Sequence, residues 1–240
     1  ISAERFWPIM RRFHAQSRAV LVATRSLADE LAGRGIGHTV RWSRGIDRAL
    51  FRPDGPAHPA MAALPGPLLL YVGRVAPEKN LEAFLGLPHP GTKVVVGAGP
   101  SLDSLRRAFP QAAFLGPLSG DELASAYRAA DCFVFPSLTD TFGLVVIEAL
   151  ACGVPVAAYP VTGPIGILGP DGRGRGGDLP APAGAVDADL GAAVVRALSL
   201  GRADAAALGA RFSWEAATDQ FLGALEAARQ QTAMDRAAAA

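Results

Sequence analysis

The sequence predicts an α/β protein built on a doubly wound parallel sheet of the Rossmann-like type. Short apolar runs follow one another along residues 65–212, and stretches with helical spacing separate most of them. Half of the 240 residues are hydrophobic, which is enough for one substantial core and part of a second. In such a sheet the ligand binds at the carboxyl ends of the strands, beside helix N-termini.

The elements of this domain alternate in order. The expected strands are Leu68–Val72, Lys93–Val96, Ala112–Leu115, Cys132–Phe135 and Val154–Ala158. The expected helices between them are Asn80–Leu85, Ser101–Phe109, Gly120–Ala130 and Phe142–Cys152. The apolar stretch 142–160 contains Glu148, Gly153 and Pro155, so we interpret it as a buried helix and a strand rather than a membrane span.

The flanking segments divide the chain further. Residues 1–47 predict a helix over Arg5–Ala19, a strand over Val20–Thr24, a helix over Leu27–Arg34 capped by Ser26, and a strand over Thr39–Ser43. Residues 48–64 are rich in proline and lack periodicity, which is typical of a linker. Residues 213–240 predict a helix that starts at Ser213 and a frayed tail.

Charge and cysteine content exclude several classes of protein. The 23 basic and 22 acidic residues leave a net charge of +1, so the chain has no footprint for nucleic acid. Cys132 and Cys152 lie in apolar runs without metal-ligand spacing, which indicates core residues of a reducing compartment and neither a disulfide nor a metal site. Only two of the basic residues are lysines, Lys79 and Lys93.

Glycine turns follow two of the expected strands, and both turns resemble loops that bind phosphate groups. After the strand that ends at Val72, Gly73 is followed by Arg74 and, five residues later, by Lys79, a pair of cations suited to a diphosphate. The alternative is two solvated surface cations. Gly97 and Gly99 form half of a dinucleotide fingerprint, because the third glycine of that motif is missing. An NAD-dependent oxidoreductase is therefore one hypothesis for these glycines, and an ordinary turn is the alternative.

A third strand end carries two carboxylates eight residues apart, Asp140 and Glu148. We expect a helix to begin near Thr141, so that its free N–H groups and Asp140 face one pocket. At about 100° per residue, Glu148 then lies within about 80° of Asp140 around the helix. In this apolar helix the Glu148 carboxylate needs a polar or charged partner. The alternative to ligand binding is a structural role, in which Asp140 caps the helix and Glu148 forms a salt bridge.

These motifs together resemble the retaining glycosyltransferases of family 4, which have the GT-B fold. Asp140 to Glu148 resembles their E-x7-E motif, and Gly73 to Lys79 resembles their phosphate-binding loop. Residues 139–164 are similar to bacterial α-mannosyltransferases and sulfoquinovosyl-diacylglycerol synthases. Residues 41–47 resemble the interdomain hinge, and residues 212–215 resemble the start of the C-terminal crossover helix.

The resemblance implies an enzyme that moves a hexose from a nucleoside-diphosphate sugar to an acceptor with retention of configuration. Arg74 and Lys79 would hold the diphosphate, Glu148 the ribose, and Asp140 the sugar. The resemblance implies no metal and no cofactor. The other donor-binding positions it implies are Gly73, Gly97, Gly99, Thr141, Phe142 and Gly143.

The sequence departs from the family in two respects. Asp140 is one methylene shorter than the family's Glu, which leaves the donor sugar and its base open. Residues 1–47 match only the end of the family's acceptor-binding domain, so we expect a donor-binding part, 65–212, that binds nucleotide but does not transfer sugar by itself. A lipid, glycan or small-molecule acceptor, and a cytoplasmic location with or without membrane docking, fit this expectation. The alternative is a non-catalytic nucleotide-sugar-binding module.

Overall fold

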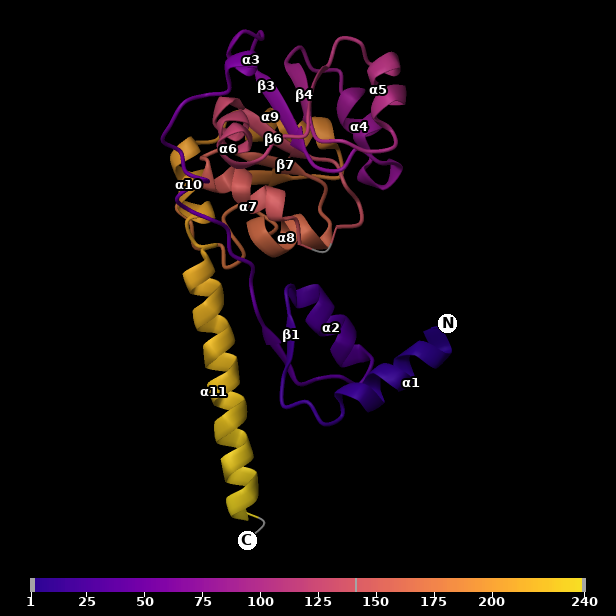
Figure 1. Ribbon diagram of the computed structural model, residues 1–240, viewed down its shortest axis with the longest axis vertical. Coiled ribbons are helices and arrows are strands. Elements are labelled where there is room, and N and C mark those ends of the chain that lie inside the picture. Colours follow the sequence, from indigo (N-terminus) through magenta and orange to yellow (C-terminus); the bar gives the residue numbers. More distant parts are fainter. Residues whose placement is uncertain (1–2, 141, 239–240) are drawn as a thin grey trace. The chain divides into compact units, whose positions relative to one another are not determined.

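The computed structural model describes residues 3–140 and 142–238 (Figure 1). The chain forms two compact units: one of residues 46–211, and one of the residues up to 45 together with those from 212 onward.

The proline-rich stretch expected to be a linker belongs to the larger unit. It contains a short helix, α3 (Pro59–Ala62). Phe51 is buried with its ring centroid 6.0 Å from that of Tyr127, and the backbone N–H of His58 donates to the Ser125 carbonyl at 3.1 Å. Arg128 Nε donates to the Pro56 carbonyl at 2.9 Å. Residues 46–64 therefore pack on this unit through backbone hydrogen bonds that composition alone does not reveal.

The larger unit is built on a six-stranded parallel sheet with strand order β5-β4-β3-β6-β7-β8. This confirms the predicted fold class, and four of the five expected strands agree with the structure to within one residue. The sixth strand, β8, was not predicted because its three residues carry only one β-branched side chain. The strands are β3 (Leu68–Val72), β4 (Thr92–Val96), β5 (Ala113–Gly116), β6 (Cys132–Phe135), β7 (Val156–Ala158) and β8 (Gly184–Val186).

Successive side chains of a strand point to opposite faces of a sheet, and all five residues of β3 are buried. Both faces of this sheet are therefore covered, as expected when helices pack on each side. On one face Leu69 and Tyr71 lie in a cluster with Phe84 of α4 and Val194 of α9. The helices are the 3₁₀ turn η1 (Pro77–Lys79), α4 (Leu81–Leu85), α5 (Leu102–Ala108), α6 (Gly120–Ala129), α7 (Leu144–Ala151), α8 (Thr162–Leu168), α9 (Leu190–Ala197) and α10 (Arg202–Gly209).

In the described residues, the smaller unit contains two short parallel strands and three helices. These are α1 (Ala3–His14), β1 (Val20–Val22), α2 (Arg25–Gly33), β2 (Thr39–Arg41) and α11 (Trp214–Ala238).

Two expectations for this unit were wrong in detail. Helix α1 ends at His14 instead of Ala19, and the cap of α2 is Thr24, whose hydroxyl accepts from the Leu27 N–H at 3.3 Å, instead of Ser26.

Helix α11 joins the smaller unit through polar contacts at the end of β2. The indole N–H of Trp42 donates to the Ala217 carbonyl at 3.0 Å, and the Ser43 N–H donates to Gln220 Oε1 at 2.8 Å. The C-terminal helix and the N-terminal strands thus form one unit, although about 170 residues separate them in sequence.

Both cysteines are free and buried, as expected of core residues, and burial raises the pKa of the Cys152 thiol to about 12. None of the helices in the described part of the chain has the length and apolar character that crossing a bilayer requires. Within residues 3–140 and 142–238, no three His, Cys, Asp or Glu side chains gather closely enough to hold a metal ion.

Candidate functional site

The candidate site lies where the strand order of the sheet reverses. The chain runs from β3 outward through β4 and β5, and then returns to place β6 on the other side of β3. Strands β3 and β6 are parallel neighbours, with Leu69 opposite Cys132 and Leu70 opposite Phe133. The β3 loop (residues 73–80) and the β6 loop (residues 136–143) therefore leave the same edge of the sheet, at the crevice where doubly wound proteins bind ligands.

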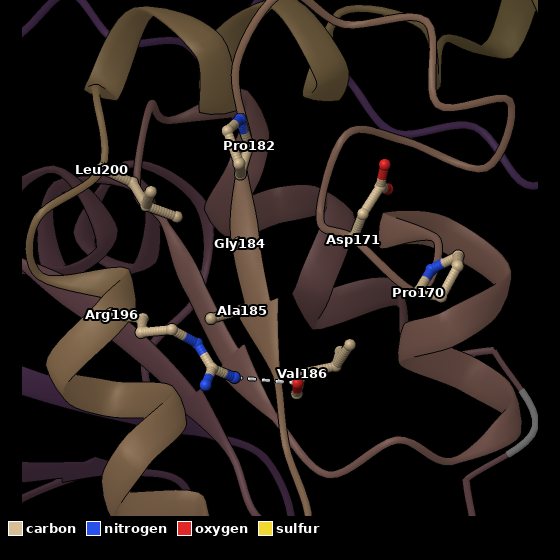
Figure 2. Close-up of a pocket in the computed structure, with 8 residues that line it drawn as sticks. All are labelled: Pro170, Asp171, Pro182, Gly184, Ala185, Val186, Arg196 and Leu200. Atoms are coloured by element: carbon tan, nitrogen blue, oxygen red, sulfur yellow. Dashed lines mark hydrogen bonds between the residues drawn. The ribbon is translucent and has the colours of Figure 1, made fainter.

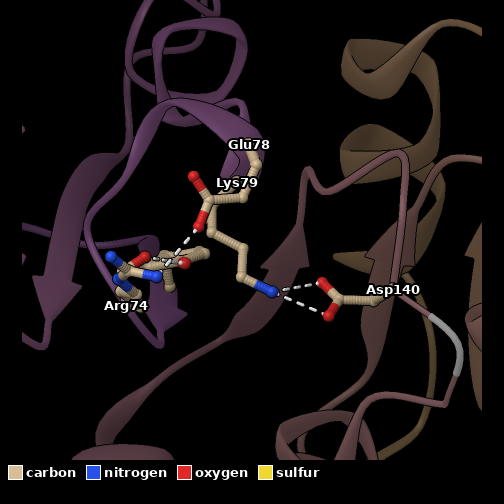
Figure 3. Close-up of polar contacts among 5 residues, drawn as sticks. Arg74, Glu78, Lys79 and Asp140 are labelled. Carbon is tan, nitrogen blue, oxygen red and sulfur yellow. Dashed lines mark hydrogen bonds and ion pairs between the residues drawn. The ribbon is translucent and has the colours of Figure 1, made fainter. Parts of the chain in front are cut away.

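An ion pair joins these two loops. Lys79 Nζ donates to both carboxylate oxygens of Asp140 at 2.7 Å (Figure 3). The two side chains are only 23% and 25% exposed, so solvent screens this pair less than it screens a surface pair. The family resemblance assigned both residues to one donor, and the structure brings them into direct contact although they are 61 positions apart in sequence.

Arg74 lies on the same loop as Lys79 but is open to solvent. Its side chain is 65% exposed, and Nη1 lies 3.5 Å from Glu78 Oε1 (Figure 3). An exposed pair at this distance stabilises the fold little. The guanidinium is therefore accessible to an anionic ligand while Lys79 is held by Asp140.

Two polar contacts that the sequence did not predict hold the β3 loop in place. The buried Tyr71 hydroxyl donates to the Arg74 carbonyl at 2.8 Å, and Asn80 Nδ2 donates to the Pro136 carbonyl of the β6 loop at 3.1 Å. Asn80 has φ 55°, a left-handed conformation that Asn tolerates better than most residues. Burial raises the pKa of Tyr71, and the charges of Asp140 and Glu78 raise it further.

The glycines of the predicted site allow the loops after β3 and β4 to lie against each other. A Cβ atom at Gly97 would stand 1.9 Å from the Gly73 carbonyl oxygen, and one at Gly99 would stand 2.2 Å from the Val75 carbonyl oxygen. The Val75 N–H donates to the Ala98 carbonyl at 2.9 Å in this interface. Loop packing accounts for both glycines, and their contact with a ligand stays a prediction.

Helix α7 begins at Leu144, so the expectation of a start near Thr141 was wrong. Gly143 precedes the helix with φ 88°, a left-handed conformation that glycine adopts readily. Thr141 lies outside the described residues, and Phe142 is buried. Because Asp140 lies outside the helix, the spacing of eight residues does not place it on the same side of α7 as Glu148.

Glu148 lies one turn inside α7 and has a partner on α6. Its Oε2 accepts from the Tyr127 hydroxyl at 2.8 Å. Burial raises the pKa of the Glu148 carboxyl, and the Tyr127 hydrogen bond opposes that rise. The structure therefore brings Lys79 and Asp140 together. Arg74 shares the β3 loop with Lys79 but pairs with Glu78, and Glu148 is hydrogen-bonded to Tyr127. Nothing in the sequence pattern singled out Tyr127, because the pairing depends on how two helices pack.

A pocket of about 220 Å³ lies at the far edge of the sheet, beside β8 (Figure 2). It contains none of the predicted site residues. Its charged side chains are already engaged: Arg196 donates to Asp187 Oδ2 at 2.8 Å and to the Val186 carbonyl at 3.0 Å, and Asp171 accepts from the Arg173 N–H at 3.1 Å. The pocket is lined by Pro170, Asp171, Pro182, Gly184, Ala185, Val186, Arg196 and Leu200.

Known proteins resemble this chain in sequence and in fold. The chain is 33% identical to the GDP-mannose-dependent alpha-mannosyltransferase of Mycobacterium tuberculosis (strain CDC 1551 / Oshkosh), over 95% of this chain and 62% of the relative. It is 34% identical to the sulfoquinovosyl transferase SQD2 of Arabidopsis thaliana, over 72% of this chain and 36% of the relative. The chain thus spans less than two thirds of the length of each of these two relatives.

The fold agrees with that of a solved structure. Anabaena Alr3699/HepE in complex with UDP superposes with a TM-score of 0.72 at 17% identity, over 94% of this chain and 68% of that one. The model of the family described as "Glycosyl transferases group 1" matches residues 66–199, which is more than half of the chain and includes both loops of the candidate site. The chain therefore belongs to the group 1 glycosyltransferase family.

Proposed function

We propose that this chain is the donor-binding part of a retaining glycosyltransferase, which transfers a hexose from a nucleoside-diphosphate sugar to an acceptor. The observation that carries the proposal is the ion pair between Lys79 and Asp140 at the strand-order reversal, with Arg74 exposed on the same loop as Lys79. The relatives support it, since one is named for GDP-mannose and one solved neighbour was determined with UDP.

In this proposal the β3 loop binds the diphosphate. Arg74 offers a planar fork of donors, and Lys79 has three N–H donors, two of which contact Asp140. The third remains for a phosphate oxygen. Negative charge grows on the diphosphate as the glycosidic bond breaks, so fixed cations stabilise the transition state more than the ground state. The proposed scheme uses these side chains as the source of positive charge and requires no metal or other cofactor.

The rest of the donor is assigned to the β6 loop and α7. Asp140 and the backbone of residues 141–143 would hold the sugar, and Glu148 would accept hydrogen bonds from the ribose hydroxyls. Retention follows if the acceptor hydroxyl attacks the face that the diphosphate leaves. The oxygen of the acceptor then forms the new bond to the anomeric carbon, and its proton passes to the departing phosphate.

Replacing Glu148 by Gln tests the ribose contact. Gln retains an oxygen that can accept from Tyr127 but loses the charge that strengthens a hydrogen bond to ribose, so UDP or GDP affinity should fall by about 1 to 3 kcal/mol. Titration calorimetry measures the change, with circular dichroism as the check on folding. Unchanged affinity for both nucleotides in a folded variant would give Glu148 a structural role only.

Product analysis separates transfer from the alternative, a non-catalytic nucleotide-sugar-binding module. The longer protein that contains this chain would be incubated with a panel of UDP- and GDP-sugars and candidate acceptors, and products would be identified by mass spectrometry. A glycosylated acceptor with retained configuration supports the proposal. Donor binding without any product would support the module.

A further inference from the structure

Tyr127 is held in one orientation by the core. It is fully buried on α6, and its ring lies edge-on to two others, with centroids 6.0 Å from Phe51 and 5.8 Å from Phe133. Such packing leaves the ring no other rotamer of similar energy. The hydroxyl therefore has a fixed position, and at that position it meets Glu148 Oε2 at 2.8 Å.

This hydrogen bond constrains the orientation of the Glu148 carboxylate. A Glu side chain has three rotatable bonds, and the last of them is soft, so an unrestrained carboxylate turns freely. With Oε2 bound to Tyr127, that rotation is stopped. Oε1 receives no hydrogen bond from the described residues and keeps its lone pairs for a ligand.

A buried phenol in this place is not explained by packing alone. Phe would fill the same volume without a hydroxyl that needs a partner in an apolar surrounding. The rings of Phe51 and Phe133 pack against Tyr127, and its hydroxyl donates to the residue assigned to the ribose.

We propose that Tyr127 is a positioning residue that orients Glu148 to accept the 2′ and 3′ hydroxyls of the donor ribose. The proposal rests on the proposed function. It adds that recognition of the ribose is set from α6, by a side chain that does not touch the nucleotide.

The test compares UDP and GDP with their 2′,3′-dideoxy analogues on the 240-residue chain. The wild-type chain should bind the ribose nucleotides more tightly than the dideoxy nucleotides. Tyr127→Phe should lower the affinity for the ribose nucleotides by about three- to tenfold, and it should leave dideoxy affinity unchanged. Tyr71→Phe is the matched control: it also removes a buried hydroxyl, and any loss that it causes should be equal for ribose and dideoxy nucleotides.

The outcomes distinguish the two proposals. If the wild-type chain binds ribose and dideoxy nucleotides equally, the role of Glu148 in the proposed function is wrong. If the wild-type chain discriminates and Tyr127→Phe discriminates equally well, the positioning role of Tyr127 is overturned. A double variant, Tyr127→Phe with Glu148→Gln, should show no further ribose-dependent loss beyond Glu148→Gln alone.

A second measurement does not depend on whether the Phe variant folds. The chain has three tyrosines, so incorporation of 3-fluorotyrosine gives three ¹⁹F resonances. Tyr71→Phe and Tyr159→Phe assign two of them, and the remaining resonance is that of Tyr127. The chemical shift of the Tyr127 resonance should change more with UDP or GDP than with the matching dideoxy nucleotide. Only a ribose hydroxyl donates a hydrogen bond to the Glu148 carboxylate, which Tyr127 also contacts. Equal shifts at saturation would contradict the proposal.

Discussion

Replacing Lys79 by Met should weaken binding of UDP or GDP by about 10- to 100-fold, because it removes a charged donor from a partly buried diphosphate site. The loss should be smaller for UMP or GMP, which lack the second phosphate. A further effect adds to it: Asp140 keeps its negative charge but loses the ammonium 2.7 Å away, so it repels the incoming phosphates. Calorimetry with the nucleoside mono- and diphosphates measures the loss of affinity for each.

The other lysine of the chain provides a matched control. Lys93 lies near the start of β4, at the opposite end of the strand from the loops, and donates to the Leu87 carbonyl at 2.7 Å. Lys93→Met removes the same charge and should leave nucleotide affinity unchanged. Adding Asp140→Asn to Lys79→Met should restore part of the lost affinity, since it removes the unpaired carboxylate. Full diphosphate affinity in a folded Lys79→Met variant would exclude the β3 loop as the phosphate site.

Gly97→Ala should destabilise the larger unit by about 2 to 5 kcal/mol. The added methyl group would stand 1.9 Å from the Gly73 carbonyl oxygen, a backbone atom that cannot move without shifting the β3 loop. In addition, φ is 136° at this position, which L-residues rarely adopt. Chemical denaturation of the wild-type and variant chains measures the difference in unfolding free energy.

Gly116→Ala separates the two causes of this destabilisation, which are the steric clash and the backbone conformation. Gly116 ends the neighbouring strand β5 with φ 78°, but a Cβ atom there would meet no atom within 4 Å. Its cost should be limited to the backbone conformation, about 1 to 2 kcal/mol. If Gly97→Ala costs no more than Gly116→Ala, the two loops are not as closely packed as the structure describes.

Most of the sheet could be predicted from sequence because its strands are apolar runs between turn residues. The run Leu68–Val72 agrees with β3 at both ends, and Cys132–Phe135 agrees with β6. Strand β8 could not be predicted in this way: Gly184 to Val186 is short, follows a segment rich in Gly and Pro, and becomes a strand only by pairing with β7. Pairing between distant segments is a tertiary interaction that composition does not encode.

The candidate site could be predicted in outline but not in its contacts. Sheet topology alone places Lys79 and Asp140 at one edge, since both follow parallel strands. Their direct ion pair, the Asn80 contact with the β6 loop and the Tyr127 contact with Glu148 depend on side-chain geometry. The start of α7 was placed too early because Gly143, which adopts a left-handed conformation, was taken as part of the helix.

A crystal structure of this chain with UDP or GDP tests the central claim most directly. We expect the diphosphate at the carboxyl ends of β3 and β6, with a phosphate oxygen within hydrogen-bond distance of Lys79 Nζ and of the Arg74 guanidinium. We also expect the ribose hydroxyls at Glu148 Oε1. A nucleotide bound at another edge of the sheet, such as the pocket beside β8, with the Lys79–Asp140 pair untouched, would contradict the account.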